Sequence, residues 1–431
     1  MRKRNLFRLI LFLWLINVFG CGFGGFSDGS SSGTVPGGSG SDTDTKVSGV
    51  VSKGLFKSGT VRFYAVNFDG SETLLRTTSI GAFGNYSARL SSQKSTSNGS
   101  YNGVVLIKAT GSYIDEATGA ELAIGDNHPL RAIIANPSGT LFVSITPLTE
   151  LATRKAFAAQ QAGSLIATTD VTAANALVSA MFKVDILGTK PVEPDSTEHG
   201  FGIASVGQAQ RDYTLALAAI SQMAKNGSGA LGDTLNVLAD DIADGSMTVE
   251  NAAAFRTALA GFLGSDINAT GVKDINSTNL VNAGGTVKIV KVGTAEKTGA
   301  GNVIGGVTIT LKLPPGVSIR ADLDKPDKAE KEPLSGIVKG SGAITGGTYV
   351  RSSYVPSSGL LTISLASSNG FTAGEFATIT CDVAAGITRN ATDFTIYKNP
   401  SDPNDPKNFK AVDGNGVPFP ESVVSGEILP D

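Results

Sequence analysis

The spacing of hydrophobic positions changes twice along residues 47–431. Residues 47–146 alternate with a period of two, as in TVRFYAV, where Val61, Phe63 and Ala65 share one face. Turn sequences such as FDGSE and GAFGN separate these runs. Six or seven short strands within about 100 residues predict a small antiparallel β-sandwich.

A helical period begins at Thr146, which can cap a helix, with Pro147 suited to the first helical position and Glu150 in the first turn. Four apolar stripes follow and predict a helical bundle over residues 147–283, although such stripes also suit a cofactor or partner groove. A long loop at 188–202 is either functional or a mobile connection. The stripes comprise Ala174, Leu177, Val178, Met181 and Phe182; Tyr213, Leu217, Ile220 and Ala224; Leu231, Leu235, Leu238 and Ile242; and Ala252, Phe255, Leu259 and Phe262.

The period of two returns at Gly285, in runs such as TVKIVKVG, GVTITLKLP and GLLTISLAS. We expect a second sandwich of eight or nine strands over residues 284–431. The predicted fold class is therefore multidomain α+β, with an antiparallel β-sandwich, a helical bundle and a second β-sandwich in chain order.

The first residues have the pattern of a targeting segment. Basic residues at 2–4 precede an apolar run, Leu9–Ile16, and a small Gly20 precedes Cys21. This pattern resembles a bacterial lipoprotein signal, which implies a signal peptide over 1–20, acylation of Cys21 and a membrane anchor; an ordinary secretory signal is the alternative. Residues 21–46, rich in Gly and Ser, are expected to form a flexible tether.

Charge and cysteine content narrow the possible partners. Without the signal, 31 basic residues face 38 acidic ones, a charge of about −7, which argues against nucleic acid and against an electrostatic membrane patch. Cys21 and Cys381 are the only cysteines, so acylation of the first leaves no intramolecular disulfide. Cys381 lies in the alternating strand FATITCDV, where we expect it on the core face with Ala377, Ile379 and Val383, and Phe376 on the opposite face.

Two family resemblances follow from longer motifs. The order VSGVVSKG, TVRFYAV, GNYSARL and VVLIKATG resembles the carboxypeptidase regulatory-like, transthyretin-type (Ig-like) modules of bacterial surface proteins. The segments TLKLPPGV, GLLTISLAS and GFTAGEFATITCDVAAG resemble cohesin-like, carbohydrate-binding-module-like domains of bacterial exported proteins. The second resemblance implies a domain that binds a partner module or has no known ligand. Related sandwiches bind polysaccharides. A charged insert, Asp322–Glu332, interrupts its pattern.

Catalytic motifs are absent from the sequence. There is no HExxH, CxxC, CxxCH or Walker lysine, and the only histidines are His128 and His199. GFSDG at 25–29 lacks the strand and helix of a nucleophile elbow, and GSGALG at 227–232 follows a helix instead of a strand. We therefore expect no enzyme; the alternative is an exported hydrolase using carboxylates of the helical region, Asp240, Asp241 and Asp244.

Two sets of residues in the last region are candidate ligands. Exposed aromatic rings could stack on a sugar, unless they pack in the core; these are Tyr349, Tyr354, Tyr397 and Phe409. A nonstandard calcium site could use oxygen ligands near Pro406 and Lys407, unless they only form turns; these are Asp402, Asn404, Asp405 and Asp413. No other cofactor is expected.

Together these patterns predict a non-enzymatic protein of adhesion or assembly type, anchored by lipid to the bacterial cell envelope. Gly22 lacks the aspartate that marks inner-membrane retention in some bacteria, which favours the outer membrane. The expected partner of the last sandwich is an envelope protein or a polysaccharide.

Overall fold

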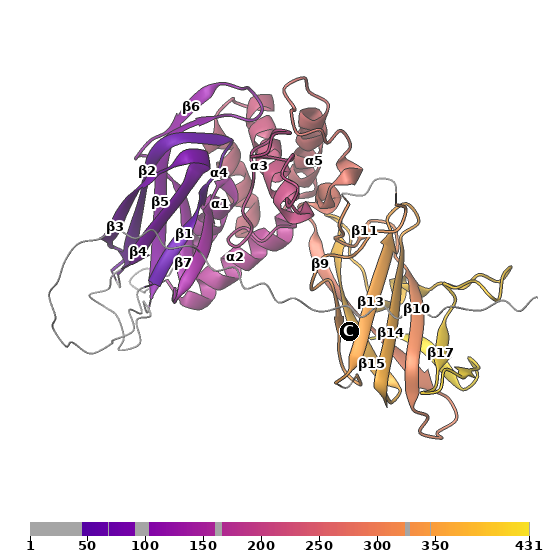
Figure 1. Cartoon of the computed structure of the whole chain (residues 1–431). Coiled ribbons are helices and arrows are strands. Elements are labelled where there is room, and N and C mark those ends of the chain that lie inside the picture. The colour runs from indigo at the N-terminus through magenta and orange to yellow at the C-terminus, as the bar shows by residue number, and fades with distance from the viewer. Residues whose placement is uncertain are drawn as a thin grey trace, which may run out of the picture. The chain divides into compact units, whose positions relative to one another are not determined.

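The computed structural model describes residues 45–67, 69–90, 103–159, 166–323, 328–344 and 346–430. Its elements are strands, then helices, then strands again, so the chain is α+β as predicted (Figure 1). The predicted signal peptide, Cys21 and nearly all of the tether lie outside the described residues.

The first β region contains two sheets that share one core. One sheet has the order β4-β1-β8, and the other has the order β3-β2-β5-β6 with β7 also paired to β5. All pairs are antiparallel except β1 with β8, which is parallel. The strands are β1 (Thr45–Val51), β2 (Leu55–Val66), β3 (Glu72–Ile80), β4 (Asn85–Leu90), β5 (Val104–Ile114), β6 (Glu121–Ile124), β7 (Leu130–Ala135) and β8 (Thr140–Ile145).

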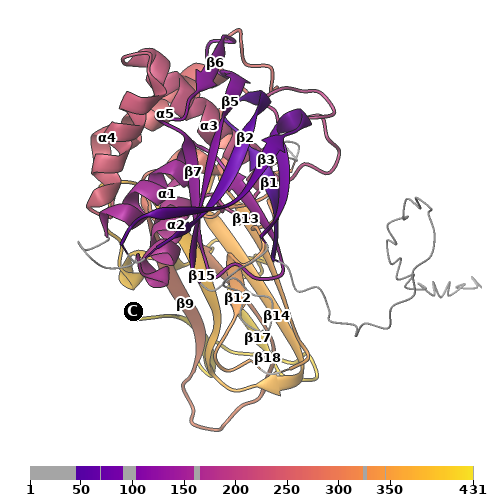
Figure 2. The ribbon, with the colours of Figure 1, turned by 90° about the vertical axis from the view of Figure 1, so that its left-hand side faces the viewer.

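The larger sheet is buried on both faces. Val105 and Ile107 of β5 belong to the core shared with the other sheet. Leu106 of β5 and Ile133 of β7 pack instead with Val171 and other small apolar residues of the helices α1 (Pro147–Ala158) and α2 (Thr168–Phe182). Figure 2 shows both helices beside β7. The uninterrupted apolar run VVLI in β5 is the sequence trace of this double burial.

The remaining helices are α3 (Gln208–Asn226), α4 (Leu231–Ala243) and α5 (Val249–Leu263). Most residues of the predicted stripes face a common core, with Leu177 and Leu231 partly exposed, while Ala174 packs with Leu106 and Ile133 of the sheet. Thr146 caps α1 as expected: its hydroxyl accepts from the backbone N–H groups of Leu148 and Thr149. No helix in the described part of the chain is both long and apolar enough to cross a membrane.

The second β region is an antiparallel sandwich. One sheet has the order β13-β14-β10-β17-β18, with β16 on β10, and the other has the order β11-β15-β9-β19, with β12 on β15. The inward side chains of β10 and β14, among them Ile309 and Ile363, form its core. The strands are β9 (Thr286–Glu296), β10 (Ile304–Lys312), β11 (Val317–Ser318), β12 (Val338–Gly340), β13 (Thr348–Val355), β14 (Leu360–Phe371), β15 (Gly374–Val383), β16 (Thr395–Ile396), β17 (Lys410–Val412), β18 (Pro418–Phe419) and β19 (Val424–Leu429).

Strand β15 confirms one part of its predicted pattern and corrects another. Cys381 is fully buried with Ile379, and burial followed by the charge of Asp382 raises the pKa of its thiol well above the usual value. Phe376 is also buried, contrary to the alternation, because the register shifts between Glu375 and Ala377. A bulge of this kind turns a side chain to the other face.

Candidate functional site

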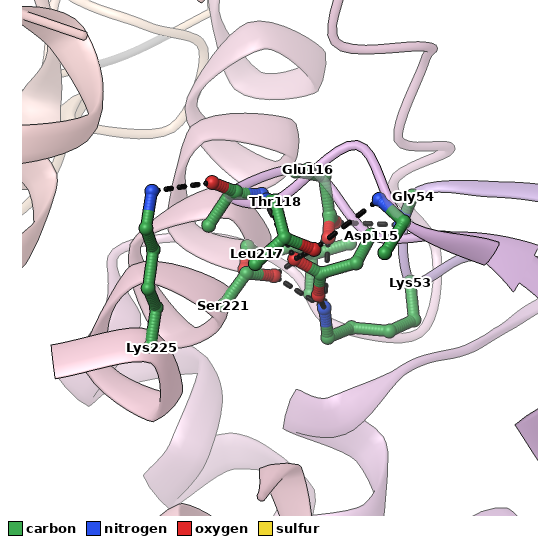
Figure 3. A network of polar contacts seen from close by, with 10 residues as sticks. Lys53, Gly54, Asp115, Glu116, Thr118, Leu217, Ser221 and Lys225 are labelled. Atoms are coloured by element: carbon green, nitrogen blue, oxygen red, sulfur yellow. Dashed lines mark hydrogen bonds and ion pairs between the residues drawn. The ribbon is translucent and has the colours of Figure 1, made fainter. Parts of the chain in front are cut away.

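The most buried polar cluster of the first β region surrounds Lys53, in the link between β1 and β2 (Figure 3). Its ammonium lies 2.7 Å from Asp115 Oδ2 and 2.8 Å from Glu116 Oε2 in the β5–β6 turn, and it also donates to the hydroxyl of Ser221 on α3. Ser221 donates to Glu116 in turn, at 2.6 Å. The cluster thus joins three segments that are distant in sequence.

This cluster places a lysine beside a serine, the pairing that some acyl-transfer enzymes use to activate the hydroxyl. Burial alone would lower the pKa of Lys53, but the charges of Glu116 and Asp115 outweigh it and raise this pKa to about 12. Lys53 therefore stays an ammonium and cannot take the proton of Ser221. With all four side chains buried, the arrangement serves to hold the sandwich to α3.

The carboxylates of the alternative hydrolase hypothesis do not form a shared site. Asp241 Oδ2 accepts from the backbone N–H and hydroxyl of Thr248 and from the amide of Asn251, so it supports the start of α5. Asp240 and Asp244 lie exposed on and just after α4. Among the described residues, no hydrogen bond joins the three carboxylates to a common group.

The candidate calcium ligands act as acceptors within their own turns. Asp402 Oδ1 accepts from the N–H of Asn404, Asp405 Oδ1 from that of Lys407, and Asp413 Oδ1 from two N–H groups of its own loop. Within the described ranges, no group of three or more His, Cys, Asp or Glu residues is placed to hold a metal.

The candidate aromatic residues divide between surface and core. Tyr349 is 68% exposed, whereas Tyr354 is buried in the sandwich core. Tyr397 is half-buried and its hydroxyl contacts Asp405, and Phe409 packs against the core. Tyr349 and Tyr354 are five residues apart on one strand, so the period of two assigns them to opposite faces; that signal was present in the sequence. Of the two alternatives for these rings, Tyr354 follows core packing and Tyr349 exposure.

Tyr349 belongs to a surface that the sequence did not single out, the outer face of β13, β14 and β10. The register places Tyr349 opposite Ala366 and Arg351 opposite Ser364. Hydroxyl pairs continue across to β10, Thr308 with Ser364 at 3.1 Å and Thr310 with Thr362 at 2.9 Å. We call this surface the hydroxyl face; it comprises Thr308, Tyr349, Arg351, Ser353, Thr362, Ser364 and Ala366, and it ends at Thr310, which is fully buried. Alternation in TYVRSSYV and LLTISLAS would have revealed it.

One small cavity adjoins the hydroxyl face and is lined by Arg351 and Ser353 together with charged residues of 328–332. Another lies beside Tyr354 and is lined by residues of 276–282 and 316–323. Two further cavities lie between the first β region and the helices. The larger has about 1020 Å³ and is lined by His128 and by Arg131, Glu150 and Arg154. Its charged side chains largely satisfy one another: Glu150 accepts from Nε and Nη2 of Arg131 at 2.8 and 2.7 Å and from Nε of Arg154 at 2.7 Å. The two histidines do not share a site, because His199 lines a different, smaller cavity.

Comparisons with known proteins give a limited picture. No family model matches the chain, and no curated protein matches it. Among solved structures, a type II cohesin A11 from Bacteroides cellulosolvens is similar over 32% of this chain and 84% of its own, at 15% identity and a TM-score of 0.24. The second type II cohesin module of the ScaA scaffoldin from Acetivibrio cellulolyticus covers 31% of this chain and 80% of its own, at 15% identity and a TM-score of 0.23. At this level the likeness bears on neither ligand nor activity.

Proposed function

We propose that this protein is a non-catalytic binding protein of the bacterial cell envelope. In this proposal, acylated Cys21 anchors the chain, most simply in the outer membrane, and the hydroxyl face of the last sandwich contacts a protein partner. The sequence resemblances to lipoprotein signals and to cohesin-like domains support the anchor and the type of role. The chemistry of the described clusters, in which the buried lysine and the acidic groups are used for structure, supports a role without catalysis.

The hydroxyl face is the observation that carries the binding proposal. Its inner strands present short side chains, Thr308, Thr362 and Ser364, which are partly exposed and whose hydroxyls pair across the strands. At its edge Tyr349 stands 68% exposed beside Arg351. Tyrosine and arginine are the residue types most often found as anchors of protein interfaces, and a flat polar sheet around them excludes water when a partner docks.

Photo-crosslinking in native cells tests the binding proposal. With a photoreactive phenylalanine analogue at position 349 of the full chain, we expect one discrete adduct that protease treatment removes. The matched control is position 74 on β3, where Leu74 is 54% exposed outside the hydroxyl face. Absence of an adduct at 349, or equal adducts at both positions, contradicts the proposal. An adduct that resists protease but yields to glycosidases assigns the face to a polysaccharide instead.

The anchor has its own test, because it is independent of the hydroxyl face. Mass spectrometry of membrane fractions should find a mature chain that begins at an acylated Cys21. We expect Cys21→Ser to leave the precursor unacylated and uncleaved at this position. A wild-type chain that carries an unmodified Cys21, or begins after it, would rule the lipoprotein assignment out.

A further inference from the structure

The smaller cavity lies between the first β region and the long connection that precedes α3. It has a volume of about 210 Å³, and its walls come from the β1–β2 link, the turn η1 (Ala82–Gly84) and residues 190–206. Its floor is apolar and is formed by Val50, Leu55, Phe56, Val192 and Ile203. A hollow of this size and lining fits one side chain or a small molecule of similar length.

Two rings form one wall of this cavity. The ring of Phe83 stacks on the imidazole of His199, with centroids 4.3 Å apart and planes inclined by 28°. Phe83 is 43% exposed and has a φ of 58°, in the left-handed region that bulky residues rarely adopt. The backbone of η1 thus holds an aromatic face at the cavity instead of in the sandwich core.

Glu193 supplies a carboxylate with one unsatisfied oxygen. The residue is half-buried, but its Oε1 is inaccessible to water and has no hydrogen-bond partner in the described part of the chain. The carboxylates of Asp115, Glu116 and Glu150 differ, because Asp115 and Glu116 contact Lys53, and Glu150 contacts two arginines. A carboxylate oxygen that is shielded from water without a hydrogen bond is stabilised when a cation reaches it.

The electrostatic surroundings of Glu193 agree with this reading. Burial, followed by the charge of Asp195, raises the pKa of Glu193, and His199 opposes the shift. Glu198 and Lys190 also line the cavity, and the polar groups that the other walls contribute are neutral, among them Asn85 and Gln210. Among the described residues Lys190 makes no ion pair with Glu193, so an ammonium from outside can reach this carboxylate beside His199.

We propose that this cavity binds an aliphatic primary ammonium group, with the ammonium at Glu193 and its methylene chain between the Phe83 ring and the apolar floor. The Phe83 ring and the floor together bury the methylene chain. A lysine side chain of a polypeptide and a small free amine share this chemistry. The site is separate from the hydroxyl face, so either proposal can fail without the other.

The two histidines provide a direct readout in the full chain. With ¹³C-labelled histidine, the imidazole signals of His199 and His128 are the only two to follow, and His128→Gln assigns them. Titration with pentylamine should shift the His199 signal saturably and leave that of His128 in place. Neutral 1-pentanol, of similar length, should produce no such shift.

Variants of the cavity separate charge from shape. Glu193→Gln should weaken pentylamine binding about tenfold or more, as expected for the loss of a charge-assisted hydrogen bond. Lys190→Met, in the same cavity, should bind at least as tightly as the wild type. Phe83→Gly relieves the positive φ, so we expect it to fold at least as stably while binding the amine more weakly.

The outcomes decide both the site and the source of the ammonium. Pentylamine shifts that are absent, equal at both histidines or unchanged in Glu193→Gln would overturn the proposal. Binding of Nα-acetyl-L-lysine methylamide more tightly than pentylamine supports a polypeptide lysine as the natural ligand. Binding of pentylamine alone supports the ammonium site with a free amine as its ligand.

Discussion

The two β regions are built from the same alternating pattern but are covered differently. In the first, consecutive residues of β5 are all buried from Val104 to Ile107, because one face of the sheet meets the other sheet and the opposite face meets α1 and α2. In the second, β14 alternates between buried and partly exposed residues from Leu361 to Leu365. A sheet covered by helices becomes a fixed framework, whereas an uncovered face stays available to a partner.

The two β regions also differ in where they place polar side chains. The first region buries Lys53 with Asp115, Glu116 and Ser221, all of them nearly inaccessible to water. The polar groups of the hydroxyl face are short and mostly uncharged, and the partly exposed hydroxyls of Thr308 and Ser364 hydrogen-bond across strands. The second region also buries a charge, Asp382 of β15 beside Lys183 and Arg320, but on the sheet opposite the hydroxyl face. We therefore expect single substitutions to cost more at the buried charges than on the hydroxyl face.

Among the substitutions that test this difference between the two regions, Lys53→Met is expected to reduce stability most. The methionine fills a similar volume but leaves two buried carboxylates without their cation, which should lower the free energy of unfolding by about 3–5 kcal/mol. Chemical denaturation of the full chain, followed by circular dichroism, measures the change. The matched control is Lys57→Met, which removes an ion pair with Glu121 whose partners are 47% and 53% exposed. That control should cost about 0–1 kcal/mol, and equal effects of both variants would contradict the structural role of the cluster.

The same cluster predicts how stability depends on pH. The pKa of Lys53 is raised to about 12, so its contribution is complete below the ordinary value of 10.5 and is lost as pH rises through about 12. Burial would raise the pKa of Asp115, but Lys53 outweighs it and lowers this pKa below 3.8, so that contribution is lost as pH falls through the lowered value. In Lys53→Met, the free energy of unfolding should fall less steeply as pH rises through about 12. If this alkaline loss of stability is unchanged in the variant, other groups cause it.

Alanine substitutions at neighbouring positions test the difference in cover directly. Leu106→Ala and Ile107→Ala in β5 should each cost about 2–5 kcal/mol, because both faces of that strand are packed. In β14, Ile363→Ala should cost about 2–5 kcal/mol, whereas Ser364→Ala should cost only about 0.5–1.5 kcal/mol, the contribution of one hydrogen bond. Denaturant midpoints of the four variants measure this pattern. If Leu106→Ala lowers the stability only slightly, the packing of helices against the first sheet contributes little.

The smallest effect concerns the ion pairs that fasten α1 to β7. Glu150→Gln replaces a buried carboxylate that accepts from Arg131 and Arg154, and should cost about 1.5–3 kcal/mol, as for hydrogen bonds to a charged group. Glu121→Gln, on an exposed pair of the same region, should cost at most about 1 kcal/mol. Thermal melting compares the two variants, and a harmless Glu150→Gln would show that apolar packing alone holds the helix to the sheet.

Local pattern was sufficient to predict the class of every region. Period two and period 3.6 arise from residues a few positions apart, so the strands, the four helical stripes and the Thr146 cap could be read directly. The burial of the run VVLI on both faces was not predicted, because it depends on the packing of α1 and α2 against the sheet. The parallel pairing of β1 with β8 was missed, because strand partners far apart in sequence leave no local trace.

The sequence by itself determined the order of elements, the pattern typical of a signal at Cys21 and the lack of familiar catalytic motifs. Only the tertiary structure decided which polar groups meet: Lys53 contacts residues 62, 63 and 168 positions away, and Phe83 of a β-turn stacks on His199 of an interhelical loop. It also left Oε1 of the half-buried Glu193 inaccessible to water and without a hydrogen bond from the described residues. The physical reason is that the hydrophobic period determines which face of each element is buried. It does not determine which distant elements pack together, and the burial and pairing of charged groups depend on that packing.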